Sequence, residues 1–231
     1  QPLNKVGTSD PQIPPAPSVV RPVEDDDTEE PDPTQETQER DAEVLIEACL
    51  EHGVGQLQLL IDSGLSVNAR DRAGRTALMW AVYKNRKDTV KLLLEKGTDV
   101  NIQDSGGRSA LMWASLSGDS DVMNILVDSD VEIDARDSHG RTALMWTCLS
   151  GNAELVKIVV ACGPDIDARD NEGKTALMWA CEKTHMEVID ALLAWGADAT
   201  IANNLGVTPL ALALERGLEH VVDLLRQYAT E

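Results

Sequence analysis

The sequence predicts an all-α solenoid of stacked helix-turn-helix units with β-turn or hairpin tips. The first observation is a five-residue motif, TALMW or SALMW, which starts at Thr76, Ser109, Thr142 and Thr175 and so recurs every 33 residues. The second is that every unit has the same internal order, a polar turn followed by two short apolar helices. A fixed period of this length indicates supersecondary units that bury their apolar faces against their neighbours.

Each unit begins with a tight turn. An Asp precedes a Gly by three residues in Asp71–Gly74, Asp104–Gly107, Asp137–Gly140 and Asp170–Gly173, and Asn203–Gly206 repeats the pattern more loosely. The Asp side chain can accept hydrogen bonds from its own backbone, and Gly tolerates the positive φ angle that tight turns often need. These segments are therefore expected at the tips of the solenoid.

Two helices follow each turn. A Thr or Ser is expected to cap the first helix, as Thr76 does before the segment 77–81. The second helix carries apolar residues at helical spacing, as in segment 90–94. A Gly such as Gly97 then ends it in the manner of a left-handed C-cap. Asp130 occupies the equivalent position in the next unit, so it either adopts the left-handed conformation or its helix ends differently.

These motifs resemble the ankyrin repeat, whose pattern is D-x-x-G-x-T-P-L-H-x-A followed by a second helix and G-A-D-V-N. Residues 74–231 match the pattern closely, through Thr208-Pro209-Leu210 and Gly196-Ala197-Asp198, and residues 41–73 match it at lower fidelity. The resemblance implies an ankyrin-repeat domain over residues 41–231, with terminal repeats that act as caps. We expect six repeats, at residues 41–73, 74–106, 107–139, 140–172, 173–205 and 206–231.

Four repeats depart from the family pattern in the same way. Ala replaces the usual Pro, Met replaces the usual His, and Trp always follows, at Met79–Trp80, Met112–Trp113, Met145–Trp146 and Met178–Trp179. In the family that His bonds to neighbouring backbone, so packing must compensate for its loss. We expect a Met–Trp ladder in the core, stabilised by apolar burial and sulfur–aromatic contacts, and the alternative is that one Trp faces a ligand.

Residues 1–40 are expected to form a disordered, acidic and proline-rich tail. Eight of the ten prolines lie between Pro2 and Pro33, and the run 24–32, EDDDTEEPD, contains no basic residue. Such a segment cannot bury enough apolar surface to offset the entropy of ordering its backbone. Residues 1–43 carry a charge of −9 of the total of −20. An acidic body with an acidic tail disfavours binding to nucleic acids and to anionic membranes.

The sequence predicts no catalytic, cofactor or metal site. Cys49, Cys148, Cys162 and Cys181 show no metal-ligand spacing with the histidines, and the carboxylates that recur with the repeat are interpreted as turn formers. No segment reaches the roughly 18 apolar residues that a membrane span requires. We expect a non-enzymatic protein in a reducing compartment. The cytoplasm or nucleus is favoured, and an organelle interior after removal of a presequence stays open.

The ankyrin resemblance implies a partner-binding surface on the concave side, made of the first helices and the turn tips. On the first helices the expected contacts are an apolar column, Leu50, Tyr83, Leu116 and Leu149, with the neighbouring Lys84. On the turns they are Arg72, Arg75, Arg108, His139 and Arg141, and the row is extended by Arg70, Arg136 and Arg169 just before the turns. Exposed apolar rows often mark interfaces, although packing against the turns is the alternative. A basic residue after the turn Gly often serves the fold in this family, so both roles stay open.

The function predicted from these features is a protein-protein interaction scaffold or adaptor, as a subunit of a larger complex. The partner is expected to be a protein segment with apolar and acidic residues, with no nucleic acid, no membrane insertion and no required homo-oligomer. The alternative is a regulatory or targeting factor, such as an inhibitor or a client escort, whose binding surface is modulated by the acidic tail. The tail either lies on a partner or folds back over the chain's own basic row.

Overall fold

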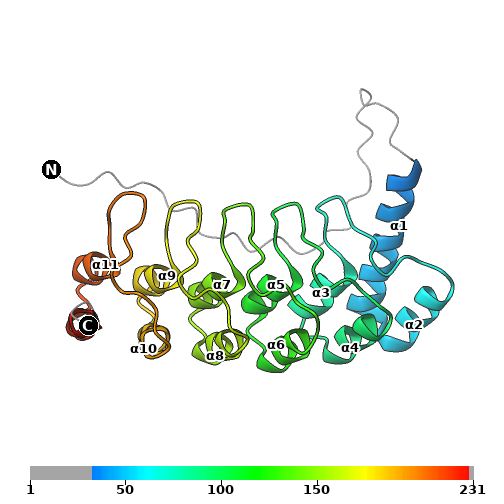
Figure 1. Cartoon of the computed structure of the whole chain (residues 1–231). Coiled ribbons are helices and arrows are strands. Elements are labelled where there is room, and N and C mark those ends of the chain that lie inside the picture. The colour runs from blue at the N-terminus through cyan, green and yellow to red at the C-terminus, as the bar shows by residue number, and fades with distance from the viewer. Residues whose placement is uncertain (1–32, 229–231) are drawn as a thin grey trace.

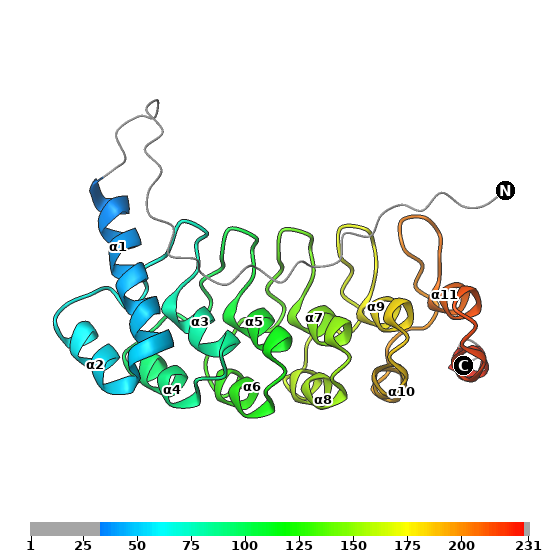
Figure 2. The same cartoon turned by 180° about the vertical axis from the view of Figure 1, so that it is seen from behind.

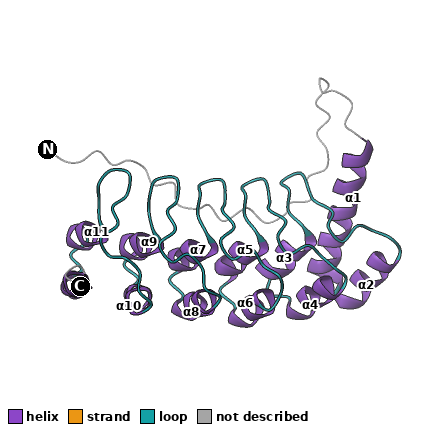
Figure 3. Cartoon of the chain, viewed as in Figure 1, coloured by secondary structure: helices purple, strands orange, loops and turns teal. Residues whose placement is uncertain are grey.

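A computed structural model describes residues 33–228 of the chain. Within this range twelve α-helices and one π-helix are present and no strand is found, which confirms the predicted all-α solenoid (Figure 3). The helices are α1 (Pro33–Glu47), the π-helix η1 (Ala48–His52), α2 (Val54–Asp62), α3 (Ala77–Tyr83), α4 (Lys87–Glu95), α5 (Ala110–Ser117), α6 (Ser120–Val127), α7 (Ala143–Ser150), α8 (Ala153–Ala161), α9 (Ala176–Lys183), α10 (Met186–Ala194), α11 (Pro209–Glu215) and α12 (Glu219–Tyr228).

The helices form two parallel rows. The first helices α3, α5, α7, α9 and α11 make one row, and the second helices α4, α6, α8, α10 and α12 make the other (Figures 1 and 2). Each first helix contacts the next first helix, and each second helix contacts the next second helix. The turns stand up from the row of first helices (Figure 1). Each unit thus contacts only its neighbours, as in other solenoids.

Helix α1 begins earlier than the sequence predicted. Residues 33–40 were expected in the disordered tail, but they form the first half of α1. Pro33 starts the helix, where its missing N–H costs nothing, and the following segment is free of Gly and rich in Gln and Glu. The second half of α1 buries Ala42, Leu45 and Ile46, and α1 contacts η1 and α3. The rest of the predicted tail, residues 1–32, lies outside the described residues.

The Met–Trp ladder lies in the core, as predicted. The exposed fraction is at most 1% for Met79, Met112, Met145 and Met178, and at most 5% for Trp80, Trp113, Trp146 and Trp179. The rings of Trp80 and Trp113 lie 5.8 Å apart, so the ladder also joins neighbouring repeats. Large side chains that contact the next unit supply much of the apolar burial that stabilises such an array.

The helix ends follow the prediction at most positions. The hydroxyl groups of Thr76, Thr142 and Thr175 accept a hydrogen bond from the backbone N–H three residues later, whereas Ser109 makes no such bond. Gly97 adopts the expected positive φ angle, 79°. Asp130 does not adopt a positive φ angle, so the helix before it ends differently from its sisters, which was the second of the two expectations. There α6 ends at Val127 and the N–H of Val131 bonds to the carbonyl of Ser129.

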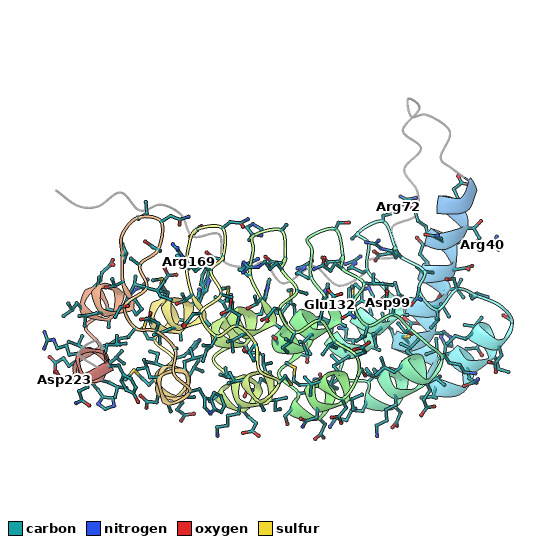
Figure 4. The ribbon with its side chains drawn as sticks, in the orientation of Figure 1. Arg40, Arg72, Asp99, Glu132, Arg169 and Asp223 are labelled. Carbon is teal, nitrogen blue, oxygen red and sulfur yellow. The ribbon has the colours of Figure 1, made fainter. Side chains whose placement is uncertain are left out.

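Hydrogen bonds also link the repeats at the turns. At the tips, the N–H groups of Ser105, Ser138, Asn171 and Asn204 each donate to a carbonyl of the preceding turn, at 2.9 to 3.0 Å. Nearer the helices, the Asn68 side chain accepts from the N–H of Asp99 at 2.9 Å, and the Asn101 side chain accepts from the N–H of Glu132 at 2.8 Å (Figure 4). Two lines of hydrogen bonds therefore hold each turn at a fixed position beside the next one.

Candidate binding surface

Each turn is organised by the carboxylate of its Asp. In the turn that joins the third and fourth repeats, Asp137 Oδ1 accepts hydrogen bonds from the N–H groups of His139 and Arg141, at 2.8 and 2.9 Å. The same pair of bonds forms around Asp71, Asp104 and Asp170. This agrees with the prediction that the recurring carboxylates form turns. It also presents the tips in one repeated conformation.

The second oxygen of the carboxylate joins the turn to the first helix. Asp137 Oδ2 accepts from Arg141 Nε at 2.8 Å and from Trp146 Nε1 at 3.1 Å. The Arg141 guanidinium lies 4.4 Å from the centre of the Trp146 ring. The Asp137 side chain is 0% exposed and that of Arg141 is 8% exposed. Burial makes these charge-assisted bonds strong, but it also makes each partner dependent on the other.

This arrangement is missing a bond in one repeat and altered in another. At the first turn Asp71 pairs with Arg75 at 2.7 Å, but the Nε1 atom of the buried Trp80 has no hydrogen-bond partner among the described residues. In the fifth repeat Lys174 takes the place of Arg and pairs with Glu182 at 2.8 Å and with Glu172 at 3.1 Å. Burial alone would lower the pKa of Lys174, but its bonds to Glu182 and Glu172 outweigh that effect and raise the pKa.

The structure divides the predicted basic residues into two groups. Arg75, Arg108 and Arg141 turn inward, pair with the Asp of their own turn and lie over a Trp ring. Their charge is compensated within the fold, and a contact with a partner stays a prediction for them. Arg72 and His139 are exposed on the turns, and the side chain of Arg72 is 73% exposed although it pairs with Glu39 of α1 at 3.2 Å (Figure 4).

The predicted apolar column is half-buried. Leu50, Tyr83, Leu116 and Leu149 all pack against the core with part of each side chain at the surface. Tyr83 packs edge-on against two rings, at 6.1 Å from Trp80 and 5.6 Å from Trp113. The ammonium of the exposed Lys84 lies 5.2 Å from its ring centre. No described residue forms a hydrogen bond with the Tyr83 hydroxyl. The column ends at Glu182, which is paired with Lys174.

A line of hydrogen bonds that was not predicted from the sequence runs beside the turns. We call it the arginine ladder. Arg70 donates to the carbonyl of Gln103 at 2.6 Å, Gln103 donates to that of Arg136 at 2.9 Å, Arg136 donates to that of Arg169 at 2.6 Å, and Arg169 donates to that of Ala202 at 3.1 Å. Every donor reaches the residue 33 positions ahead. The signal in the sequence was the equivalent position of these four side chains, one residue before each turn Asp.

The cysteines supply a test of this packing. Cys49, Cys148 and Cys181 are buried, and burial raises the pKa of Cys49 and of Cys181 to about 12. Cys162 is exposed, although partial burial raises its pKa as well. We expect a maleimide to modify Cys162 alone in the native protein, faster as the pH rises, because the thiolate is the reactive form. Mass spectrometry of the intact chain checks this, and comparable labelling of a second cysteine would contradict the packing.

Two other kinds of site are absent from the part of the chain that the structure describes. No group of three or more His, Cys, Asp or Glu side chains there is placed to hold a metal ion, and no helix there has the length and apolar character needed to cross a membrane.

Comparison with known proteins agrees with the repeat geometry. No curated protein matches the chain closely. A family model of ankyrin repeats in three copies matches residues 28–104, 45–137, 98–170 and 151–231, which together cover both helix rows and all the turns described above. The chain belongs to the ankyrin-repeat family.

Proposed function

We propose that this chain is a scaffold or adaptor that holds a partner protein against its first helices and turn tips. Ankyrin repeats are protein-protein interaction modules, and the family is typically not enzymatic. The observation that carries the proposal is the apolar column of Leu50, Tyr83, Leu116 and Leu149, which the fold leaves partly uncovered on consecutive repeats. A row of large apolar side chains at the surface is the usual core of an interface.

Tyr83 has the features of a central contact. Its ring is held by Trp80 and Trp113, so little side-chain entropy is lost when a partner packs against it. Its hydroxyl has no hydrogen-bond partner within residues 33–228 and can bond to a partner. Tyrosine is enriched among the residues that dominate binding energies. The exposed Lys84 beside the column favours a partner segment that combines apolar and acidic side chains.

Substitution of the column tests the proposal. We expect the triple variant Tyr83→Glu, Leu116→Glu and Leu149→Glu to abolish binding, because three buried carboxylates would face the partner's apolar segment. Because these side chains are half-buried, circular dichroism and thermal melting must accompany the assay. The milder change Leu116→Gln alone should weaken binding at least about tenfold, which corresponds to about 1.4 kcal/mol. The partner for the titration is identified beforehand by cross-linking from a photoreactive amino acid at position 83.

A matched control uses exposed apolar residues outside the first helices and the turn tips. Leu59 on α2, Trp195 directly after α10 and Tyr228 at the end of α12 are exposed by 66, 42 and 40%. Their replacement by Glu should leave the affinity unchanged, and a photoreactive residue at position 195 should not capture the same partner. If the column variants bind normally while the control variants do not, the surface is wrongly assigned.

A regulatory or targeting factor is the second candidate function. The observation that favours it is the acidic run 24–32, seven carboxylates in nine residues directly before α1. If the chain is such a factor, its acidic tail competes with a ligand for the turn side of the binding surface.

A further inference from the structure

We propose that the chain's own acidic run, residues 24–32, docks along the arginine ladder. The contact would place carboxylates of the run against Arg70 and Arg136 and cover part of the turn side of the surface described above. The run itself lies outside the described residues. Regulation of partner binding by this contact rests on the proposed function, but the contact itself does not.

The first step is that the ladder carries uncompensated positive charge. Arg70 donates to the carbonyls of Gly74 and Gln103, and Arg136 donates to those of Gly140 and Arg169. Arg169 donates to two carbonyls and to the side-chain oxygen of Asn204. All three side chains are exposed, and none forms an ion pair with a carboxylate within residues 33–228. Hydrogen bonds to neutral oxygens fix a guanidinium in place and leave its charge available.

The charges of the neighbouring basic residues, in contrast, are already compensated. Arg75, Arg108 and Arg141 pair with the Asp of their own turns, and Arg72 pairs with Glu39. An anionic segment that approaches the turns would therefore be attracted mainly to the ladder. Figure 4 labels Arg72 on the first turn beside α1 and Arg169 on the turn that precedes α9.

The second step is that the ladder begins beside α1, the helix that directly follows the acidic run. A hollow of about 360 Å³ lies between α1 and the first turn, lined by Gln38 and Glu39 on one side and by Arg70, Asp71, Arg72 and Ser105 on the other. The acidic run stops at Asp32, and α1 starts at Pro33, which is five residues, or about 8 Å of helix, before Gln38. The run is therefore tethered to the helix that borders Arg70.

The third step is length. Nine extended residues reach about 30 Å, and three repeat steps of about 10 Å each separate Arg70 from Arg169. Because about 8 Å of that reach is needed to come alongside Arg70, the run spans Arg70 and Arg136 and ends short of Arg169. Tethering raises its local concentration to the millimolar range, well above that of a free acidic peptide. For an acidic chain that repels free anions at long range, the tethered segment is the favoured occupant.

The chain itself supplies the substitution that tests the contact. Gln103 occupies the ladder position of its repeat and makes the same kind of bond to the next repeat, at 2.9 Å, without a charge. Arg136→Gln with Arg169→Gln therefore removes two charges and keeps a donor at each position. Lys91→Gln with Lys157→Gln, on exposed positions of α4 and α8, is the control with the same change in charge.

The experiment measures the contact directly, without a partner. A nitroxide spin label is attached at Thr28→Cys in a Cys162→Ser background, because the other three cysteines are buried. At low salt we expect the label to broaden the amide NMR signals of the turn residues Ser105, Ser138 and Asn171, and not those of α4 or α8. At about 1 M NaCl, where the screening length falls to about 3 Å, the broadening should be lost. Mixing labelled and isotope-enriched chains separates contacts within one chain from contacts between two.

Two sets of variants decide the outcome. The Arg→Gln pair, and separately the change of all seven carboxylates of run 24–32 to amides, should each remove the broadening, while the Lys→Gln pair should preserve it. The carboxylate variant leaves the repeats untouched, so loss of folding cannot explain its effect. If the turns are not broadened at low salt, or if the broadening survives both sets of variants, the proposal is wrong. Because no partner is present, that result leaves the apolar column and its own test unaffected.

Discussion

Replacement of Asp137 by alanine is expected to lower the free energy of unfolding by about 3–5 kcal/mol. Its carboxylate is fully buried and accepts bonds from the backbone N–H groups of His139 and Arg141, from Arg141 Nε and from Trp146 Nε1. Without the carboxylate, a charged guanidinium and an indole N–H stay buried and lose their shared acceptor. Removal of one partner from a buried ion pair is costly for this reason.

Asp71→Ala is the matched control for this prediction. The Asp71 side chain is 12% exposed and bonds to Arg75, but no bond to Trp80 exists. The loss for Asp71→Ala should therefore be smaller by at least about 1 kcal/mol, the contribution of one typical hydrogen bond. Urea denaturation followed by circular dichroism measures both variants. Equal losses would mean that the indole bond and the deeper burial at Asp137 contribute little.

Gly107→Ala is the second substitution with a large expected effect. Gly107 has a φ angle of 75°, and an added Cβ would lie 2.7 Å from the backbone nitrogen of Ser138 and 2.9 Å from the carbonyl carbon of Asp137. Backbone atoms cannot rotate away, so two neighbouring turns would have to separate. The bond from the Ser138 N–H to the carbonyl of Gly106, 2.9 Å long, would be strained as well. We expect a loss of about 2–5 kcal/mol, from the left-handed conformation and the overlap together.

Gly163→Ala separates these two contributions. Gly163 has nearly the same φ angle, 71°, but an added Cβ would meet no atom within 4 Å. Only the cost of the left-handed conformation, about 1–2 kcal/mol, is expected there. Thermal melting of the two variants side by side gives the comparison. Similar losses at both positions would show that the neighbouring turns move apart easily, against the close inter-turn contacts described above.

The repeat itself made most of the fold predictable. The period of 33 residues, the turn Asp and Gly and the alternation of short apolar helices were enough to place α3 to α12. The burial of the Met–Trp ladder followed from a physical argument, since an apolar pair that replaces a polar His must gain its stability from packing. A property shared by every unit is easy to read because each copy supports the same interpretation.

The properties of single units were harder to predict. The start of α1 at Pro33 was missed because low hydrophobicity and a nearby acidic run outweighed the helix-favouring residues of segment 34–40. The pairing of Lys174 with Glu182 depends on the geometry of side chains eight positions apart, which no local pattern reveals. The missing bond at Trp80 could not be predicted either, because the turn Asp, the Arg and the Trp are the same residue types there as in the next two repeats.

The position of the candidate surface followed from the ankyrin resemblance, and its role in binding stays a prediction. The apolar column was placed by carrying the family's positions onto this sequence, and the structure adds that its side chains are half-buried. For the basic residues the deciding factor is distance to a carboxylate. Arg141 lies 2.8 Å from Asp137, whereas Arg136, only five positions earlier, reaches carbonyl groups alone. Two arginines in one turn thus differ in the charge that they leave available.

The arginine ladder has a consequence for how such a gene can change. Each rung starts at one position of a unit and ends on the carbonyl of the same position in the following unit. If one whole unit of 33 residues is duplicated or lost, every donor still finds an acceptor across the new junction, and no polar group is left unpaired there. The array can therefore become longer or shorter by unequal recombination and still fold, and its reach along a partner can evolve separately from the chemistry of any one repeat.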